Sequence, residues 1–438
     1  MSFFSKLLSF FSRSGSFVSP SNNSAGNMVP LADAAAVLHS ALSARRRARA
    51  GAEENFVFSP FSILMVFAMA LKGASGPTLL EMQRFLSLKH LPPVPKLSSE
   101  GHRGDAPVLE LVNRIYVHDD IATNQFFLDY AKTLKEEGEK TEAKAISFEE
   151  PQIAADEINS FVAQQTRDHI KDLVTPNDVG PLTRLVLVSA MYFKAAWASP
   201  FNEYETQKGT FHGLKDGKPV DQEADIMHVT LKNSPHIMLV NNRVKAIAIP
   251  YNDDNTFMYI VQPSDFKELD TLFDSKSKEE GKLYMEDLVV QMNSDEQTAQ
   301  SWGTHVQLSL PKFKLNSNTN REDLIPIFRD DLGMKTVFDS QEADFSKITG
   351  GRDLFVSSFV HAADVAVDEK GTVATSATAM GMMLRMAMRP SPTVSLDIDG
   401  PFAFQIRYSP PVDGQTMAGG PNDYIFYSGQ IVSIADAH

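Results

Sequence analysis

The sequence predicts a mixed α+β fold organised as one domain. Helical periodicity dominates the first third of the 438 residues, and strand-like patterns dominate the rest. This separation of helices from strands along the chain favours the α+β class over repeated strand–helix–strand units. No internal repeat or linker composition interrupts residues 30–438, so we expect a single domain there. Residues 1–29 are rich in Ser, Asn and Gly, and we expect a disordered or targeting tail.

The first expected helix runs from about residue 31 and is rich in Ala and Leu. It ends in a basic cluster, Arg45, Arg46, Arg47 and Arg49, whose charges complement the negative end of the helix dipole. We interpret this cluster as a solvated helix terminus rather than a binding site. Apolar periodicity predicts three further helices, at residues 74–88, 119–140 and 153–173.

A buried helix is expected at residues 60–72. This run is almost entirely apolar, follows Ser59 as a candidate N-cap, places Pro60 in the first turn and stops at Gly73. A helix that is apolar all round is typical of the interior of a protein. Directly before it, residues 55–59 have the composition of a short strand.

The longest expected strand covers residues 184–197. Its apolar residues are continuous rather than alternating, which indicates burial on both faces of a sheet. Shorter strands are expected at residues 111–117, 306–315 and 402–408.

Composition excludes several classes of partner. The net charge of −14 argues against nucleic acid or an anionic membrane surface. The longest apolar stretch, residues 63–71, is too short to span a bilayer. The chain contains no cysteine, so it has neither a disulfide nor a thiol nucleophile. We expect a monomer.

The amino terminus is compatible with more than one location of the protein. Residues 1–17 are apolar and mildly basic, but Lys6 and several serines interrupt them, so a weak signal peptide, a surface anchor and a tail fit equally. Asn22 begins a glycosylation sequon, which matters only in a secreted protein. We expect secretion, with a cytoplasmic location as the alternative.

The motifs predict no enzyme. The sequence has no GxSxG, P-loop, GxGxxG or HExxH pattern. His228 and His236 are too far apart for a metal site on one helical turn, and without cysteine a structural zinc is not expected. We therefore expect no metal and no cofactor. A hydrolase with a triad from distant positions is a minor alternative.

A stretch near the carboxyl terminus, residues 371–385, differs from the rest of the chain. Its first nine residues are small and uncharged, an acidic turn with Asp368 and Glu369 precedes it, and Arg385 follows among methionines. Small residues that alternate with Thr and Val can enter a sheet without steric conflict, yet they are polar enough to stay solvated. The stretch is therefore either a flexible linker or a segment that changes between loop and strand.

Taken in order, the motifs resemble those of the serpin family. The resemblance covers nearly all of residues 31–438 and rests on the ordered set rather than on any single motif. The matching segments are Asn55-Phe-Val-Phe-Ser-Pro-Phe-Ser62, Leu182 to Lys194 with Trp197, Leu310-Pro-Lys-Phe-Lys-Leu315, Ala343-Asp-Phe-Ser346, and His361 followed by Val365-Ala-Val-Asp-Glu369. The resemblance implies three β-sheets, about nine helices and an exposed reactive-centre loop at about residues 369–390.

The resemblance also supplies a register for the loop. In serpins the cleaved bond lies sixteen residues after the glutamate that begins the hinge, and this count from Glu369 leads to the Arg385–Met386 bond. Arg389 is the rival, but it precedes Pro390, and trypsin-like proteases cut Arg–Pro bonds poorly. The implied hinge consists of Glu369, Gly371, Thr372, Ala374, Ser376, Ala377 and Thr378.

The implied function is irreversible inhibition of a trypsin-like serine protease through a covalent acyl complex at Arg385. The freed loop would insert into the central sheet with alternate side chains, from Thr372 onward, facing the core. The alternative is a non-inhibitory serpin that acts as a carrier, chaperone or storage protein.

The residues that the resemblance implies in sheet opening are Ser59, Ser62, Ser189, Trp197 and His361. Ser189 stands where the family usually has an asparagine bonded to the histidine, so we expect a weaker or rewired hydrogen-bond network around His361.

Overall fold

The computed structural model describes most of the chain. The described residues are 31–86, 93–95, 97, 107–138, 140–232, 237–253, 255–274, 277, 280–294, 304–317, 320–372, 392–411 and 423–435. The predicted tail and most of the predicted loop lie outside them, including the candidate site residues Ala374, Ser376, Ala377, Thr378, Arg385 and Met386.

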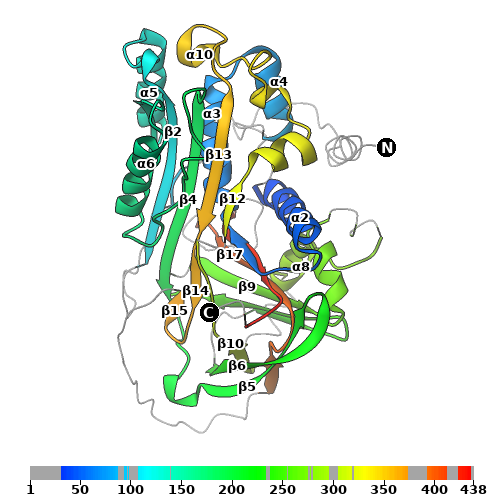
Figure 1. Ribbon diagram of the computed structural model, residues 1–438. Helices are drawn as coiled ribbons and strands as arrows, with labels where there is room; N and C mark the ends of the chain where they lie inside the picture. The colour runs from blue at the N-terminus through cyan, green and yellow to red at the C-terminus, as the bar shows by residue number, and fades with distance from the viewer. Residues whose placement is uncertain are drawn as a thin grey trace, which may run out of the picture.

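The three sheets implied by the resemblance are present (Figure 1). The eight-stranded sheet, called the large sheet below, contains β2 (Val108–His118), β3 (Thr141–Ile146), β4 (Leu185–Ala196), β11 (Phe313–Leu315), β12 (Arg321–Asp323), β13 (Val356–Ala363), β14 (Val365–Val367) and β15 (Gly371–Thr372). The six-stranded sheet has the order β1 (Phe56–Phe58), β18 (Tyr424–Ile431), β17 (Phe402–Tyr408), β9 (Thr256–Pro263), β8 (Val244–Pro250) and β7 (Ile237–Val240). The four-stranded sheet has the order β16 (Thr393–Asp397), β10 (His305–Pro311), β6 (Lys218–Leu231) and β5 (Gln207–Lys215).

The large sheet is organised around β4. On one side β2 pairs with β4 antiparallel along nearly its whole length, and β3 adds to β2. On the other side the neighbour changes along the strand: β13 pairs with β4 in parallel at one end, and β15 pairs with it antiparallel at the other. This side of β4 is where the sheet divides.

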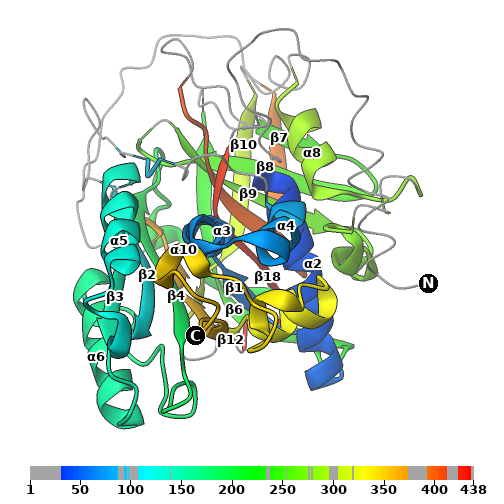
Figure 2. The ribbon, with the colours of Figure 1, turned by 90° about the horizontal axis from the view of Figure 1, so that it is seen from above.

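Helices cover both faces of the large sheet (Figures 1 and 2). The α-helices in the described part of the chain are α2 (Leu31–Ala50), α3 (Pro60–Gly73), α4 (Gly76–Phe85), α5 (Gln125–Glu137), α6 (Pro151–Gln165), α8 (Met285–Met292), which packs on the six-stranded sheet, and α10 (Ser346–Thr349). Helix α3 packs between the large sheet and β18, whereas α6 packs on the opposite face of the large sheet (Figure 2). Among the described helices, none is both long and apolar enough to cross a membrane.

The buried helix and the central strand agree closely with the sequence prediction. Helix α3 begins at Pro60 and ends one residue later than predicted, and the Ser59 side chain accepts the backbone N–H of Ser62 as an N-cap. Every residue of α3 except Lys72 is buried. The β4 residues are also buried on both faces, as their continuous apolar run predicts.

The prediction of a helix at residues 153–173 is wrong at its carboxyl end. Helix α6 ends at Gln165, and the backbone of Arg167 and Asp168 takes positive φ values of 53° and 64°, which reverse the chain. Ile170 and Leu173 are still buried against the same face of the large sheet, but from an irregular segment. Apolar periodicity therefore located the buried residues and missed the turn between them.

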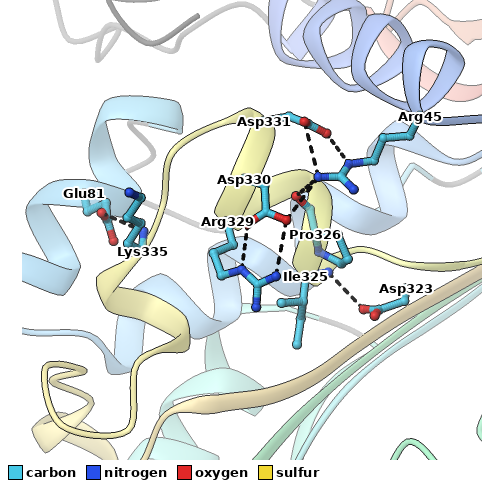
Figure 3. Close-up of polar contacts among 9 residues, drawn as sticks. All are labelled: Arg45, Glu81, Asp323, Ile325, Pro326, Arg329, Asp330, Asp331 and Lys335. Atoms are coloured by element: carbon cyan, nitrogen blue, oxygen red, sulfur yellow. Dashed lines mark hydrogen bonds and ion pairs between the residues drawn. The ribbon is translucent and has the colours of Figure 1, made fainter. Parts of the chain in front are cut away.

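The interpretation of the Arg cluster as wholly solvated is also wrong. Arg46 is 5% exposed, and its Nε donates to the Glu322 carboxylate at 2.6 Å. Arg45 donates to the Pro326 carbonyl oxygen at 2.7 Å and pairs with Asp331 (Figure 3). The end of α2 is thus fixed to the segment around residues 322–331, which lies far from it in the sequence.

A second contact fixes α4 to the same region of the chain (Figure 3). The Glu81 carboxylate accepts the backbone N–H groups of Lys335 at 3.0 Å and Thr336 at 2.8 Å, together with the Thr336 hydroxyl. Hydrogen bonds to a carboxylate are about twice as strong as neutral ones.

Replacing Glu81 should therefore destabilise the fold. We expect Glu81→Ala to lower the free energy of unfolding by about 2 kcal/mol, because it leaves several backbone donors without their acceptor. Urea unfolding measures the effect. Glu342→Ala is the matched control, since Glu342 is an exposed carboxylate nearby and its loss should cost less than about 0.5 kcal/mol. Equal losses in both variants would contradict this account.

Candidate functional site

The predicted hinge begins as a tight turn between β14 and β15. The Asp368 carboxylate accepts the backbone N–H of Lys370 at 2.8 Å and that of Gly371 at 3.1 Å. These bonds hold the backbone so that the chain leaving β14 turns back beside it. The turn therefore directs the start of the loop into the large sheet rather than away from it.

The first two residues after this turn are already part of the sheet. Gly371 pairs with Ala196 of β4 and Thr372 pairs with Ala195, while Thr372 also pairs with Val367 of β14. Position 371 can accommodate only glycine without steric overlap, since a Cβ there would lie 2.1 Å from the carbonyl oxygen of Ala195. The hinge thus enters the large sheet as a short strand between β14 and β4.

The Thr372 side chain points into the core. It is fully buried, and its hydroxyl lies 2.6 Å from the hydroxyl of Tyr251. Tyr251 stacks on Trp197 with ring centroids 4.5 Å apart, and Trp197 Nε1 donates to the Asp368 carbonyl oxygen at 2.9 Å. The stacked pair of Tyr251 and Trp197 therefore contacts both the hinge turn and the Thr372 side chain.

Glu369 fixes the turn from its other side. Its carboxylate accepts the Thr206 hydroxyl at 2.7 Å and forms an ion pair with Lys312 at 3.0 Å. Burial alone would raise the pKa of Glu369, but these two hydrogen-bonding partners hold it below its ordinary value. The next residue, Lys370, pairs with Glu203 at 3.1 Å. The hinge turn is thus held by charged groups on two neighbouring segments.

A second group of predicted residues lies together farther along β4. The Ser59 backbone N–H donates to His361 Nε2 at 2.9 Å, so the proton of the neutral imidazole resides on Nδ1, which faces Ser189 Oγ at 3.1 Å. Ser189 Oγ lies 2.9 Å from Ser62 Oγ, which in turn contacts the Asn113 amide at 2.9 Å. We call Ser59, Ser62, Asn113, Ser189 and His361 the polar cluster.

The polar cluster connects four elements: β2, β4 and β13 of the large sheet and the start of α3. Ser189 and His361 are direct partners in the β4–β13 pairing, and Ser59 and Ser62 belong to the start of α3. Burial lowers the pKa of His361 to about 3, so the imidazole is neutral across the physiological range. Ser189 contacts His361 directly, through this serine–histidine hydrogen bond.

The structure brings together four of the five residues that the sequence analysis assigned to sheet opening, and it places the fifth elsewhere. Trp197 lies at the far end of β4, against the hinge turn, rather than in the polar cluster. Sequence reasoning missed Asn113 and Tyr251. Asn113 carried a usable signal, because it is a polar residue inside the apolar run of β2. Tyr251 carried none, since it follows β8 and reaches the hinge only through the tertiary fold.

Comparison with known proteins agrees with this arrangement. The sequence pattern of the serpin (serine protease inhibitor) family matches residues 36–411. An uncharacterized serpin-like protein of Thermococcus kodakarensis is 33% identical over 371 residues, 82% of this chain and 78% of its own length. The leukocyte elastase inhibitor of Equus caballus is 30% identical over 364 residues, 81% of this chain and 90% of its own length.

This chain belongs to the serpin family. Its fold matches the crystal structure of Serpin48 from the insect Tenebrio molitor with a TM-score of 0.67 and 24% identity, over 92% of this chain and 98% of that one. Uncleaved ovalbumin matches with the same TM-score and 19% identity, over 92% of this chain and 99% of that one. At these identities the two structures support the fold alone.

This serpin has a cavity of about 430 Å³ on the outer face of the large sheet, beside the point where β13 and β14 diverge from β4. Asp364, the residue between β13 and β14, lines it. Burial raises the pKa of Asp364 to about 6, against the opposing effects of hydrogen bonds from Ser317 and the charge of Lys314. Within the described residues, no group of His, Asp and Glu side chains has the arrangement of a metal site.

The hinge geometry predicts the effect of a single methyl group. Gly371→Ala should expel β15 from the sheet, because the new Cβ would overlap the Ala195 carbonyl group. We expect the amides of residues 368–372 to exchange with solvent roughly tenfold faster or more, as for overpacked sites. Hydrogen exchange with mass spectrometry measures this. Gly180→Ala is the control, since a Cβ there meets nothing within 4 Å. Unchanged exchange in Gly371→Ala would contradict the steric argument.

The raised pKa of Asp364 predicts how stability depends on pH. The native state binds this proton more tightly than the unfolded chain, so stability from this group is full below about pH 4 and falls as the pH rises through about 6. Asp364→Asn should therefore match wild type at pH 4 and exceed it by on the order of 2 kcal/mol at pH 7. Urea unfolding at both pH values tests this, with exposed Asp129→Asn as control. A difference independent of pH would rule out the assignment.

Proposed function

We propose that this serpin is an irreversible inhibitor of trypsin-like serine proteases that is cleaved at Arg385–Met386. The observation that carries the proposal is the seating of Gly371 and Thr372 between β14 and β4. The hinge is already aligned with the space into which a cleaved loop would move. Strand insertion into an existing sheet is an established binding mode that gains main-chain hydrogen bonds.

The length of β4 supports the position of the cleaved bond. If the register of β15 continues along β4, residue 382 falls opposite Leu185, the first residue of the strand. Arg385 then lies just beyond the end of the sheet. A cleavage at Arg385 therefore frees a segment that matches β4 in length, and a fourteen-residue strand spans on the order of 45 Å.

The same register passes through the polar cluster. Continued from Thr372, it brings Thr378 opposite Ser189 on β4 and, through β14, opposite His361 on β13. These two residues now pair with each other, so the two registers agree on a single path for the inserting strand. Insertion must break the Ser189–His361 hydrogen bond and would replace it with contacts to Thr378.

The inserting residues suit this path. Thr372 faces the core, which makes Ala374, Ser376 and Thr378 the next core-facing residues, and all of them are small. About ten new ladder hydrogen bonds at roughly 1 kcal/mol each supply on the order of 10 kcal/mol. That gain drives the separation of β13 from β4.

The protease chemistry follows from Arg385. A trypsin-like protease binds a long cationic side chain in its specificity pocket, and its serine attacks the Arg385 carbonyl carbon to form an acyl-enzyme while Met386 leaves as a new amino terminus. Insertion then moves the tethered protease to the far end of the sheet. Compression that removes one oxyanion-hole donor slows deacylation by about 10²–10³-fold.

The decisive experiment mixes this serpin with trypsin and separates the products on a denaturing gel. We expect a stable adduct near the summed mass of both proteins. Arg385→Ala should abolish trapping of trypsin, whereas Arg389→Ala, the matched control, should retain it. Quantitative loop cleavage with release of active trypsin would overturn inhibition and favour the non-inhibitory alternative.

Thr372→Arg tests the insertion step separately. Thr372 is fully buried and lies against Tyr251, so an arginine there cannot enter the sheet without burying an unpaired charge. We expect this variant to become a substrate that trypsin cleaves without adduct formation, while Thr372→Ser should still form the adduct. Trapping of trypsin by Thr372→Arg would contradict insertion through this register.

A further inference from the structure

The cavity beside the point where β13 and β14 diverge from β4 contains a hydrogen-bond acceptor that has no partner among the described residues. Asp364 lies between the end of β13 at Ala363 and the start of β14 at Val365, and one oxygen of its carboxylate, Oδ1, is buried with no hydrogen-bond partner among the described residues. In the neighbouring segment, Ser317 donates hydrogen bonds to this carboxyl group and Lys314 places a positive charge near it, and both lower its pKa. A buried acceptor without a protein donor is costly, so the site suits a side chain that brings one.

The strand pattern identifies the face to which Asp364 belongs. Ala363 and Val365, on either side of it, pack into the main core beneath α3. Asp364 therefore points to the opposite face, which Tyr192 of β4 shares. There His169 stacks on Tyr192 with ring centroids 4.0 Å apart, and His169 also lines the cavity.

The hinge register connects this site with the loop. Continued three residues beyond Thr372, it places Thr375 opposite Tyr192 on β4 and opposite Asp364 on the β13–β14 side. Directly opposed residues share a face and have Cβ atoms about 4.5–5.5 Å apart, which is within reach of a hydrogen bond between short polar side chains. Thr375 would thus enter between the tyrosine ring and the carboxylate.

We propose that the cavity is the receiving site for Thr375, whose hydroxyl donates to the unpaired Asp364 oxygen when the cleaved loop inserts. The threonine methyl group then packs against Tyr192. This pairing makes Thr375 a positioning residue on the outer face of the inserted strand. The inference rests on the proposed function, because it requires loop insertion.

The charged and titratable groups around the site are compatible with this role. Lys314 comes from β11, His169 and Lys171 come from the segment after α6, and Tyr192 comes from β4. Two further carboxylates, Asp168 and Asp172, line the cavity from that same segment. Burial raises the pKa of Asp364, although hydrogen bonds from Ser317 and the charge of Lys314 oppose this effect, and Oδ1 has no hydrogen-bond partner among the described residues. A hydroxyl donor supplies one without adding charge.

The test compares native and loop-cleaved protein. An endoprotease cleaves the full chain on the carboxyl side of Thr378, the site is verified by mass spectrometry, and guanidinium midpoints are measured at pH 7. The variants are Thr375→Val, which keeps the shape and removes the hydroxyl, Thr375→Ser, which keeps the hydroxyl, Asp364→Val, and the double variant Thr375→Val/Asp364→Val. We expect Thr375→Val to lower the midpoint of the cleaved form only, and Thr375→Ser to restore most of it.

The Asp364→Val background completes the test, since Thr375→Val should have no further effect there. Equal midpoints for cleaved wild type and Thr375→Val, or equal losses in both backgrounds, would overturn the pairing. If Asp364→Val does not fold, the Thr375→Val and Thr375→Ser pair still decides the matter. A cleaved wild-type chain no more stable than the native chain would overturn loop insertion itself, and this proposal with it.

Discussion

The large sheet is closed along one half of β4 and divided along the other, and the rest of the site depends on this division. β13 pairs with β4 from Leu185 to Met191, and beyond that point β14 diverges from β4. The chain fills the start of the resulting space with its own residues 371–372. Three local features allow these two residues to enter the sheet. Glycine occupies the position where a Cβ would overlap a carbonyl group, a small hydroxyl side chain faces the core, and stacked aromatic rings pack behind that side chain.

The half of the large sheet in which β13 pairs with β4 is stabilised mainly by apolar packing. Its polar contacts determine where the pairing of these two strands is easiest to break. Helix α3 covers one face and α6 the other, so separating β13 from β4 disturbs two apolar clusters at once. The polar cluster lies inside this packing and contributes net hydrogen bonds of roughly 1 kcal/mol each. Because His361 stays neutral in the interior, these bonds are not strengthened by charge. They can be exchanged for equivalent bonds to another hydroxyl at modest cost, which a buried ion pair would not allow.

Local patterns predicted the elements whose burial is complete. The apolar run after Ser59 and the continuous run of β4 were located within a residue or two because burial on all sides leaves little choice of conformation. The acidic turn at Asp368 and Glu369 was likewise visible in the sequence. What the sequence could not show were pairings made by distant segments: Tyr251 with the hinge, and Arg46 with Glu322. These depend on which strands and helices become neighbours.

Asp364 illustrates why one position can be poorly adapted to the native fold. Its carboxylate lies where β13 and β14 part from β4, and its buried Oδ1 has no partner among the described residues. An unsatisfied buried acceptor costs about 1–3 kcal/mol. A residue that served only the native state would be apolar here, as its strand neighbours Ala363 and Val365 are on the other face. The cost is instead located on the path that the inserting strand takes in the proposed mechanism. In the proposed mechanism, a local conflict at such a point favours the arrangement in which a donor arrives, and it would bias the sheet toward the inserted state.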